Sequence, residues 1–313
     1  MTTPTADPTA PPAHWTPRAI GDLTGRTALI TGGNSGIGLE TARVLARHGA
    51  RVVLAGRSAA KLADAVAELR AEQPDALLDT AVLDLGSLAS IAATSARLAA
   101  SETIDLLINN AGVMNVPERR TTTDGLELTV GTNHLGHFAL TAGLMPALLR
   151  AEAGRVVTVS AIAASWRMGH LDDLMSERRY RPMAAYAKSK RANVVFTREL
   201  ARRLSGTSVT ALAVHPGSAV TNLQRHSEGP LSRLAIALTR RTIMGSPEGA
   251  AWPSLYAATS PHLQGGAYYA PAGRDQTSGT PKPAPLPHGA DDPTEAARLW
   301  QESERLTGVA FTI

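Results

Sequence analysis

Cysteine is absent from the 313-residue sequence, and its histidines lack the neighbours that a metal site needs. Without thiols the chain can form neither a disulfide nor a thiolate metal site. His134, His137 and His215 have no further metal-ligating residues at a suitable spacing, so we predict no metal site. Because nothing ties the fold to an oxidising compartment, we expect a cytoplasmic protein.

The sequence also lacks a strong net charge and long apolar runs. Its 31 Lys and Arg residues against 27 Asp and Glu residues give a formal net charge of only +4. The tightest basic groups, residues 178–181 and 240–241, form no stripe that could follow a nucleic-acid backbone, so we expect no nucleic-acid partner. No window approaches the roughly 18 consecutive apolar residues of a membrane helix, so we expect no membrane partner either.

The N-terminus lacks the features of a targeting segment. Residues 1–12 are mainly Thr, Pro and Ala, with neither the basic start nor the apolar core of a signal peptide. We predict a disordered tail over residues 1–20. No linker or composition shift divides residues 21–313, so we predict that they form a single domain.

What the sequence does contain is a regular alternation of short apolar runs and segments of helical periodicity. The runs are apolar and bounded mostly by Gly, Asp or Asn, as buried strands are. We expect strands at residues 27–30, 51–55, 77–83, 104–108, 155–160 and 208–214, with helices between them. This pattern predicts an α/β fold: a doubly wound, Rossmann-type, mostly parallel sheet of about seven strands with helices on both faces.

Two segments interrupt the alternation, at residues 165–182 and 217–245. Both follow predicted strands, and ligands of open α/β sheets bind outside the carboxyl ends of the strands, so we expect both insertions to shape a substrate site. Their apolar residues could line an apolar pocket or could be ordinary packing: Trp166, Met168, Leu231, Leu234, Ile236 and Leu238. Residues 271–293, rich in Pro and Gly, are expected to be irregular, and residues 294–306 to form a closing helix.

The run Thr31-Gly32-Gly33-Asn34-Ser35-Gly36-Ile37-Gly38 lies between the first predicted strand and the first predicted helix. Glycines allow positive φ and a close approach of the backbone, and a helix N-terminus stabilises phosphate through free N–H groups and its dipole. The run is therefore similar to a cradle for a dinucleotide pyrophosphate. Its spacing differs from the commonest G-x-G-x-x-G pattern, and an ordinary tight strand-to-helix turn is the alternative.

The end of the second predicted strand bears on the kind of dinucleotide. About twenty residues beyond a glycine turn an acidic residue would bind the 2′-hydroxyl of NAD, but here Gly56 is followed by Arg57. A small residue and a guanidinium suit the 2′-phosphate of NADP, so the sequence favours NADP(H) over NAD(H). The alternative is a surface arginine at a strand end.

Tyr186 and Lys190 lie four residues apart on a predicted helix and so share one face. A free tyrosine, with a pKa of about 10, is a poor acid or base at neutral pH, and an adjacent ammonium stabilises its phenolate. Ser160, at the end of a predicted strand, could donate a hydrogen bond to a carbonyl oxygen as charge develops there. Each feature alone also fits a solvated helix face or a turn, as does the loop Asn109-Asn110-Ala111-Gly112.

Together these patterns resemble the classical short-chain dehydrogenase/reductase family. Its motifs are Thr-Gly-x3-Gly-x-Gly, Asn-Asn-Ala-Gly, a serine at a strand end, Tyr-x3-Lys and Pro-Gly, and this chain carries all of them in order. They are residues 31–38, residues 109–112, Ser160, Tyr186 with Lys190, and Pro216-Gly217. The resemblance covers nearly the whole chain from Leu23 and implies a Rossmann-fold oxidoreductase.

The resemblance implies a catalytic tetrad. Asn133 matches the asparagine whose carbonyl positions a water near the lysine, and Ser160 matches the serine that polarises the substrate carbonyl. Tyr186 matches the acid or base, and Lys190 matches the residue that binds the nicotinamide ribose and lowers the tyrosine pKa.

The implied cofactor site draws on several loops. Asp84 and Leu85 match the pair beside the adenine ring, and Thr221 matches the threonine near the nicotinamide carboxamide. The cofactor-binding residues implied in this way are Gly32, Asn34, Ser35, Gly36, Ile37, Gly38, Arg57, Asp84, Leu85, Asn110, Ala111, Gly112, Tyr186, Lys190, Pro216, Gly217 and Thr221.

Residues 132–138, Thr-Asn-His-Leu-Gly-His-Phe, and residues 172–180 are similar to the branch that contains retinol dehydrogenases, WW-domain oxidoreductase and protochlorophyllide reductases. The polar N-terminus departs from the apolar anchor that retinol dehydrogenases commonly carry, which counts against a membrane retinoid substrate. The gap between Ser160 and Tyr186 is longer than is usual in the family, so we expect the insertion at 165–182 to shape the pocket entrance.

The resemblance implies an NADP(H)-dependent oxidoreductase that transfers hydride reversibly between its cofactor and a small-molecule carbonyl or alcohol, expected to be apolar. The alternative is a non-catalytic regulatory protein of the same fold that binds NADP(H), although such proteins usually lack the tyrosine or the lysine. A sugar epimerase or dehydratase fits less well, because those relatives use Thr-Gly-x2-Gly-x2-Gly. Members of the family often form homo-oligomers through the helix that bears the tyrosine, and the oligomeric state stays open.

Overall fold

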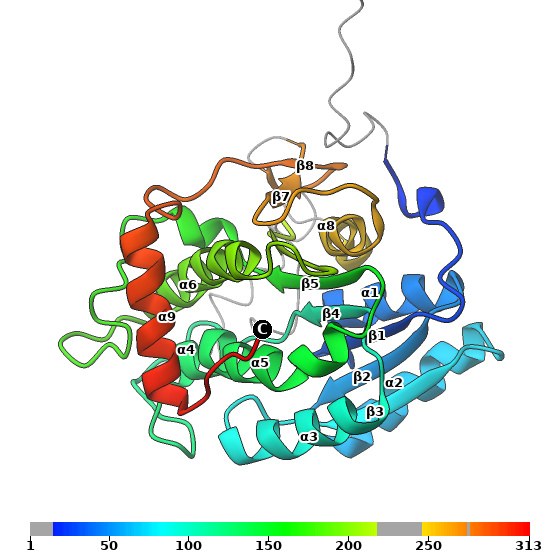
Figure 1. The fold of residues 1–313 in the computed structure, drawn as a ribbon, viewed down its shortest axis with the longest axis horizontal. Coiled ribbons are helices and arrows are strands. Elements are labelled where there is room, and N and C mark those ends of the chain that lie inside the picture. The colour runs from blue at the N-terminus through cyan, green and yellow to red at the C-terminus, as the bar shows by residue number, and fades with distance from the viewer. Residues whose placement is uncertain (1–14, 218–245, 274–275) are drawn as a thin grey trace, which may run out of the picture.

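The computed structural model describes residues 15–217, 246–273 and 276–313 (Figure 1). Within these residues one sheet of eight strands has the order β3-β2-β1-β4-β5-β6-β7-β8. Its strands are β1 Thr27–Thr31, β2 Arg51–Gly56, β3 Leu78–Val82, β4 Leu106–Asn109, β5 Gly154–Val159, β6 Val209–Val214, β7 Tyr268–Pro271 and β8 Pro281–Pro283. The first seven pair in parallel, which confirms the predicted doubly wound fold.

The eighth strand corrects one expectation. Residues 281–283 were expected to be irregular, but β8 pairs antiparallel with β7, with Tyr269 opposite Pro283. Pro281 and Pro283 have no N–H to donate, and a strand at the edge of a sheet has one side that needs no donor. Proline-rich sequence is therefore compatible with this edge position.

The helices follow the strands in the predicted alternation, and none of those in the described parts of the chain is long and apolar enough to cross a membrane. The α-helices are α1 Gly36–Arg47, α2 Ala59–Glu72, α3 Leu88–Ser101, α4 Leu128–Val130, α5 Gly136–Leu148, α6 Pro182–Arg203, α8 Pro247–Thr259 and α9 Pro293–Thr307. Short 3₁₀ turns are η1 Pro17–Ala19 and η3 Ile162–Ser165, and η2 Gly131–Leu135 is a π-helical segment. Figure 1 shows α9, in red, beside α6.

The core lies on both faces of the sheet. Successive side chains of a strand point to opposite faces. Ile30 accordingly packs in a cluster with residues of α1, α2 and α8, whereas its neighbour Leu29 packs with residues of α3, α5 and α6. Strands buried on both faces explain why the sequence reads as continuous apolar runs rather than as alternating ones.

The structure of residues 15–20 differs from the predicted disordered tail. Residues 15–20 were predicted to be disordered, but Trp15 is only 4% exposed. Its ring lies edge-on to Tyr256 and Trp252 of α8, with ring centroids 5.3 Å and 6.4 Å away. Removing an indole from water is favourable enough to order a short segment, so the prediction is wrong for residues 15–20. The remainder of the predicted tail lies outside the described residues.

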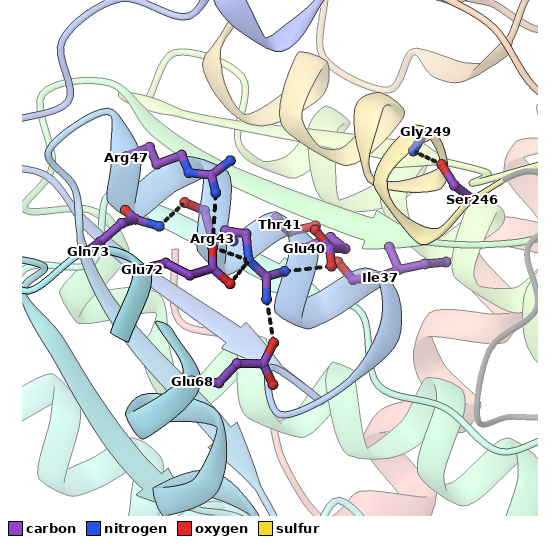
Figure 2. A network of polar contacts seen from close by, with 10 residues as sticks. All are labelled: Ile37, Glu40, Thr41, Arg43, Arg47, Glu68, Glu72, Gln73, Ser246 and Gly249. Atoms are coloured by element: carbon purple, nitrogen blue, oxygen red, sulfur yellow. Dashed lines mark hydrogen bonds and ion pairs between the residues drawn. The ribbon is translucent and has the colours of Figure 1, made fainter. Parts of the chain in front are cut away.

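A buried cation links α1 to α2. The Arg43 guanidinium, on α1, contacts Glu40 at 2.5 Å, Glu72 at 3.0 Å and also Glu68, as Figure 2 shows. Arg47 adds a second contact to Glu72 at 2.9 Å. Burying a charge is tolerable only when it is paired, and Glu40 and Glu72 raise the pKa of Arg43 against the opposing effect of burial. The pairing fixes the helix whose N-terminus carries the glycine turn.

Candidate active site

The glycine turn lies at the point where the strand order reverses. Beyond β1 the chain builds outward to β3, then crosses to β4 on the other side of β1. In open α/β sheets this switch point is where ligands bind. The glycine turn after β1 and the loop 109–112 after β4 therefore meet at one edge of the sheet.

The backbone of the turn needs its glycines. Gly32 and Gly36 have φ of +66° and +55°, values that favour glycine. A Cβ on Gly38 would press on the carbonyl oxygen of Gly32 and lie 2.6 Å from Nδ2 of Asn110. Ser35 precedes α1 without a side-chain capping bond, so it leaves the first-turn N–H groups to another acceptor. The turn thus fits the pyrophosphate of a dinucleotide.

Thr31 joins the glycine turn to the loop after β4. Its Oγ1 accepts the N–H groups of Asn110 and Ala111 at 2.9 Å and 3.0 Å. Its carbonyl oxygen accepts Nδ2 of Asn110 at 2.8 Å. The two predicted cofactor loops are therefore one hydrogen-bonded unit.

Tyr186 and Lys190 share one face of α6, as their spacing predicts. The Lys190 ammonium is buried, donates to the carbonyl oxygen of Val159 at 2.9 Å, and lies 5.9 Å from the centre of the Tyr186 ring. Tyr186 is only partly buried. Its hydroxyl-bearing ring can meet a ligand while its lysine neighbour stays inside.

Ser160 lies directly after β5 and is 1% exposed. Its hydroxyl donates to the backbone carbonyl oxygen of Lys190 at 2.7 Å, which ties the strand end to the helix turn that carries the tyrosine–lysine pair. The structure therefore brings Ser160 together with Tyr186 and Lys190, although the 25 residues 161–185 separate Ser160 from Tyr186 in the sequence.

Asn133 connects the loop after β4 to α6. Its side chain pairs with the backbone of Val113, accepting the N–H at 2.7 Å and donating to the carbonyl at 2.9 Å. It also donates to Oγ of Ser189 on α6 at 2.9 Å. A Cβ on Gly112 would lie 3.1 Å from Oδ1 of Asn133 and 3.6 Å from Nζ of Lys190, so only a small residue fits between them.

Burial changes the acidity of both titratable members. It lowers the pKa of Lys190 to about 8. It raises the pKa of Tyr186 above its ordinary value. The spacing of Tyr186 and Lys190 predicts that the ammonium lowers the pKa of Tyr186, but in the folded protein the loss of solvation has the larger effect and raises it. Tyr186 is therefore a neutral phenol at pH 7, a state suited to donating a proton.

The remaining predicted cofactor residues lie along the same edge. Arg57 is exposed just beyond Gly56, and a Cβ on Gly56 would lie 3.0 Å from Oδ1 of Asn34 in the glycine turn. Asp84 follows β3 and accepts the N–H of Gly86 at 2.9 Å. Leu85, beside Asp84, is 6% exposed.

Pro216 and Gly217 follow β6. Gly217 has φ of +79°, and its N–H donates to Nδ1 of His215 at 2.9 Å. Thr221, the apolar residues predicted at 231–238 and the insertion at 217–245 beyond Gly217 lie outside the described residues.

The insertion at 165–182 is held by α6 and by the loop after β4. Lys188 donates to Oγ of Ser176 at 3.0 Å and to the carbonyl oxygen of Asp173. The Tyr180 hydroxyl donates to the carbonyl oxygen of Val116 at 2.7 Å. Trp166 and Met168 are 38% and 47% exposed, so they are not ordinary core residues.

Two site neighbours were not predicted from the sequence. Tyr268, on β7, is buried and its hydroxyl donates to the carbonyl oxygen of Ala161, next to Ser160, at 3.4 Å. Nothing in its strand-like surroundings distinguishes it from a packing residue. His137 contacts both Thr31 and Asn133. In the sequence, His137 could have been connected to the site only through its position four residues after Asn133.

Comparison with known proteins agrees with this geometry. The family model described as short chain dehydrogenase matches residues 26–230. Human "Retinol dehydrogenase 13" is 40% identical over 296 residues, which cover 92% of this chain and 86% of the relative.

Solved structures show the same fold. An uncharacterised protein from Mycobacterium paratuberculosis is 39% identical, with a TM-score of 0.76, over 96% of this chain and 100% of that chain. A Beutenbergia cavernae protein assigned as an NAD(P)-dependent gluconate 5-dehydrogenase was solved with NADP. It is 30% identical, with a TM-score of 0.59, over 76% of this chain and 91% of that chain. The chain is thus an oxidoreductase of CH–OH groups with NAD(P), and it belongs to the classical short-chain dehydrogenase/reductase family, in its retinol dehydrogenase branch.

Proposed function

We propose that the protein transfers hydride reversibly between NADP(H) and an apolar carbonyl or alcohol. The observation that carries the proposal is the meeting of Ser160, Tyr186 and Lys190 at one sheet edge, with Oγ of Ser160 2.7 Å from the backbone oxygen of Lys190. A proton donor, a hydroxyl for the substrate oxygen and a buried cation are what carbonyl reduction requires.

The cofactor site supports a dinucleotide. The bound nicotinamide would supply or accept the hydride. The glycine turn would hold the pyrophosphate, Asp84 and Leu85 would flank the adenine, and residues 110–112 would lie along the ribose and nicotinamide. We assign Pro216, Gly217 and Thr221 to the carboxamide end and Lys190 to the nicotinamide ribose.

The residues of the chain then handle the substrate oxygen and the proton. The Ser160 hydroxyl turns from the carbonyl of Lys190 to the substrate oxygen, where it stabilises developing negative charge. The neutral Tyr186 phenol donates a proton to that oxygen. Lys190 and a water on the Asn133 carbonyl resupply the proton. In alcohol oxidation the same groups act in reverse.

Arg57 supports a preference for NADP(H). In the part of the chain that the structure describes it makes no ion pair, and it lies at the strand end beside the glycine turn. A free guanidinium there suits a 2′-phosphate. The NADP found with the Beutenbergia relative is consistent with this choice.

The cofactor assignment predicts the effect of Arg57→Leu. Loss of the guanidinium should raise the KM for NADPH about tenfold and leave the KM for NADH nearly unchanged, because only NADPH carries the 2′-phosphate. Steady-state rates with each cofactor measure both values, and Arg18→Leu, at an exposed arginine near the N-terminus, is the control. A wild-type protein that prefers NADH would contradict the assignment.

Two exposed apolar side chains and the names of the relatives support the proposed substrate class. Trp166 and Met168 are exposed on the insertion that follows η3. A panel of aldehydes, ketones and alcohols, extended to retinal and retinol because of the relatives' names, tests the class by NADPH consumption or formation. We expect turnover with apolar members of the panel. Tight NADPH binding without turnover of any member would instead favour a regulatory protein.

A further inference from the structure

His137 is a buried histidine that the proposed mechanism leaves without a role. Its side chain is 1% exposed and lies on α5, one helical turn after Asn133. Nδ1 lies 3.0 Å from the carbonyl oxygen of Asn133, and Nε2 lies 2.9 Å from Oγ1 of Thr31. The ring therefore bridges the strand end that begins the glycine turn and the segment that carries Asn133.

The hydrogen-bond partners of the His137 ring indicate which of its nitrogens carries the proton. A carbonyl oxygen only accepts, so Nδ1 carries the proton and donates it to Asn133. Nε2 is then an acceptor, and the Thr31 hydroxyl donates to it in preference to the longer 3.3 Å contact with the carbonyl of Ile108. This leaves the lone pairs of Thr31 Oγ1 for the N–H groups of Asn110 and Ala111. Burial lowers the pKa of His137 to about 4, so the ring is neutral at pH 7.

The carbonyl that His137 holds lies in an unusual stretch of backbone. Asn133 is in the π-helical segment η2, where the N–H of Gly136 donates to the carbonyl of Gly131, five residues back. Such π turns change the register of backbone bonds and are frequent at functional sites. A carbonyl oxygen has two lone pairs, so the Asn133 oxygen can accept a second donor beside the His137 ring.

We infer that His137 is a positioning residue for the proton relay, an inference that rests on the proposed function. Thr31 orients the imidazole, and the imidazole fixes the carbonyl of Asn133 so that its second lone pair faces the relay water beside Lys190. Thr31 also holds Asn110, so the same side chain aligns the relay with the cofactor loop.

The test compares three variants of the full-length protein. His137→Leu removes both ring nitrogens, whereas His137→Asn keeps a donor attached to Cγ, where Nδ1 stands. His134→Leu is the matched control, because His134 is equally buried on η2 but bonds Ser303 of α9 at 3.0 Å. Each variant is measured for kcat and KM on the best substrate of the panel, for the Kd of NADPH, and for Tm.

We expect His137→Leu to lower kcat about tenfold or more while KM and the Kd of NADPH change by less than about threefold. His137→Asn should recover a large part of that loss. His134→Leu should lower Tm by a similar amount and keep kcat within about threefold of wild type. Equal kcat values for the two leucine variants would overturn the inference.

The outcomes separate the inference from the proposed function. If the wild-type protein shows no turnover, both the proposed function and the role of His137 in the relay are wrong. If the wild type is active but His137→Leu and His134→Leu have equal kcat values, only the inference about His137 is wrong. Imidazole ¹⁵N NMR adds a readout without turnover. It should find His137 as the neutral Nδ1–H tautomer from about pH 5.5 to about pH 8, and the Nε2–H tautomer or protonation near pH 6.5 would refute the assigned bonds.

Discussion

Lys190 is a buried cation whose ammonium is bonded to a backbone oxygen. Its ammonium donates to the carbonyl of Val159 at 2.9 Å, and its side chain is almost fully buried. This bond compensates only part of the hydration that the ammonium loses, and burial lowers the pKa of Lys190 to about 8. A lysine of this kind readily releases and regains a proton, as the proposed relay requires.

The lowered pKa predicts how stability depends on pH. Between about pH 8 and pH 10.5 the unfolded chain keeps a proton on Lys190 that the folded protein has released, so the free energy of unfolding rises with pH in this window. Relative to Lys190→Met, the wild type should gain up to about 3 kcal/mol across it. Urea unfolding at several pH values measures the difference.

The control for this prediction is Lys61→Met, at an exposed lysine of α2. Its difference from wild type should stay nearly constant over the same range. A constant difference for Lys190→Met as well would show that burial does not lower the pKa of Lys190.

The residue types of the site are readable from the sequence, but not all of their hydrogen-bond partners are. Tyr186 and Lys190 were predicted to share a face because helical spacing is readable from the chain. The bond between Thr31 and His137 joins residues 106 positions apart, and no spacing rule links them. The raised pKa of Tyr186 also escaped prediction, because it depends on burial rather than on its neighbour in the helix.

At the scale of elements, the packing of Trp15 on α8 gives a stabilising contact outside the site. The indole is 4% exposed against Tyr256 and Trp252. Trp15→Ala should lower the free energy of unfolding by about 3 kcal/mol, because it removes buried apolar area and leaves a cavity. Chemical denaturation of the variant measures the loss.

Trp166→Ala is the matched control, since Trp166 is 38% exposed. It should change the free energy of unfolding by less than about 1 kcal/mol. If the two alanine variants were equally stable, Trp15 would not be part of the folded core.

Strands and helices with clear periodicity were predicted well, and elements without it were not. The first six strands follow from their apolar runs. The edge strand β8 was missed because its prolines indicate irregular structure, and pairing with β7 supplies what the local sequence does not. The ordered structure of the segment around Trp15 was not predicted, because the aromatic partners of Trp15 are more than two hundred residues away in the chain.

At the scale of the molecule, the parallel sheet is what assembles the site. Residues from the ends of β1, β4, β5 and β6 reach one edge because parallel strands all end there. Helix α6 then brings Tyr186 and Lys190 across to Ser160, and η2 brings Asn133. The order of motifs along the chain was sufficient to predict this convergence, but it does not identify the substrate.

The central claim is that Tyr186 is the proton donor of an NADP(H)-dependent hydride transfer. The most direct test is the kcat of Tyr186→Phe with NADPH and the best carbonyl of the panel, together with its Kd for NADPH. We predict that kcat falls about 1,000-fold or more, because the phenol proton is lost, while Kd stays within about threefold of wild type. A phenylalanine variant that keeps the wild-type kcat would contradict the account.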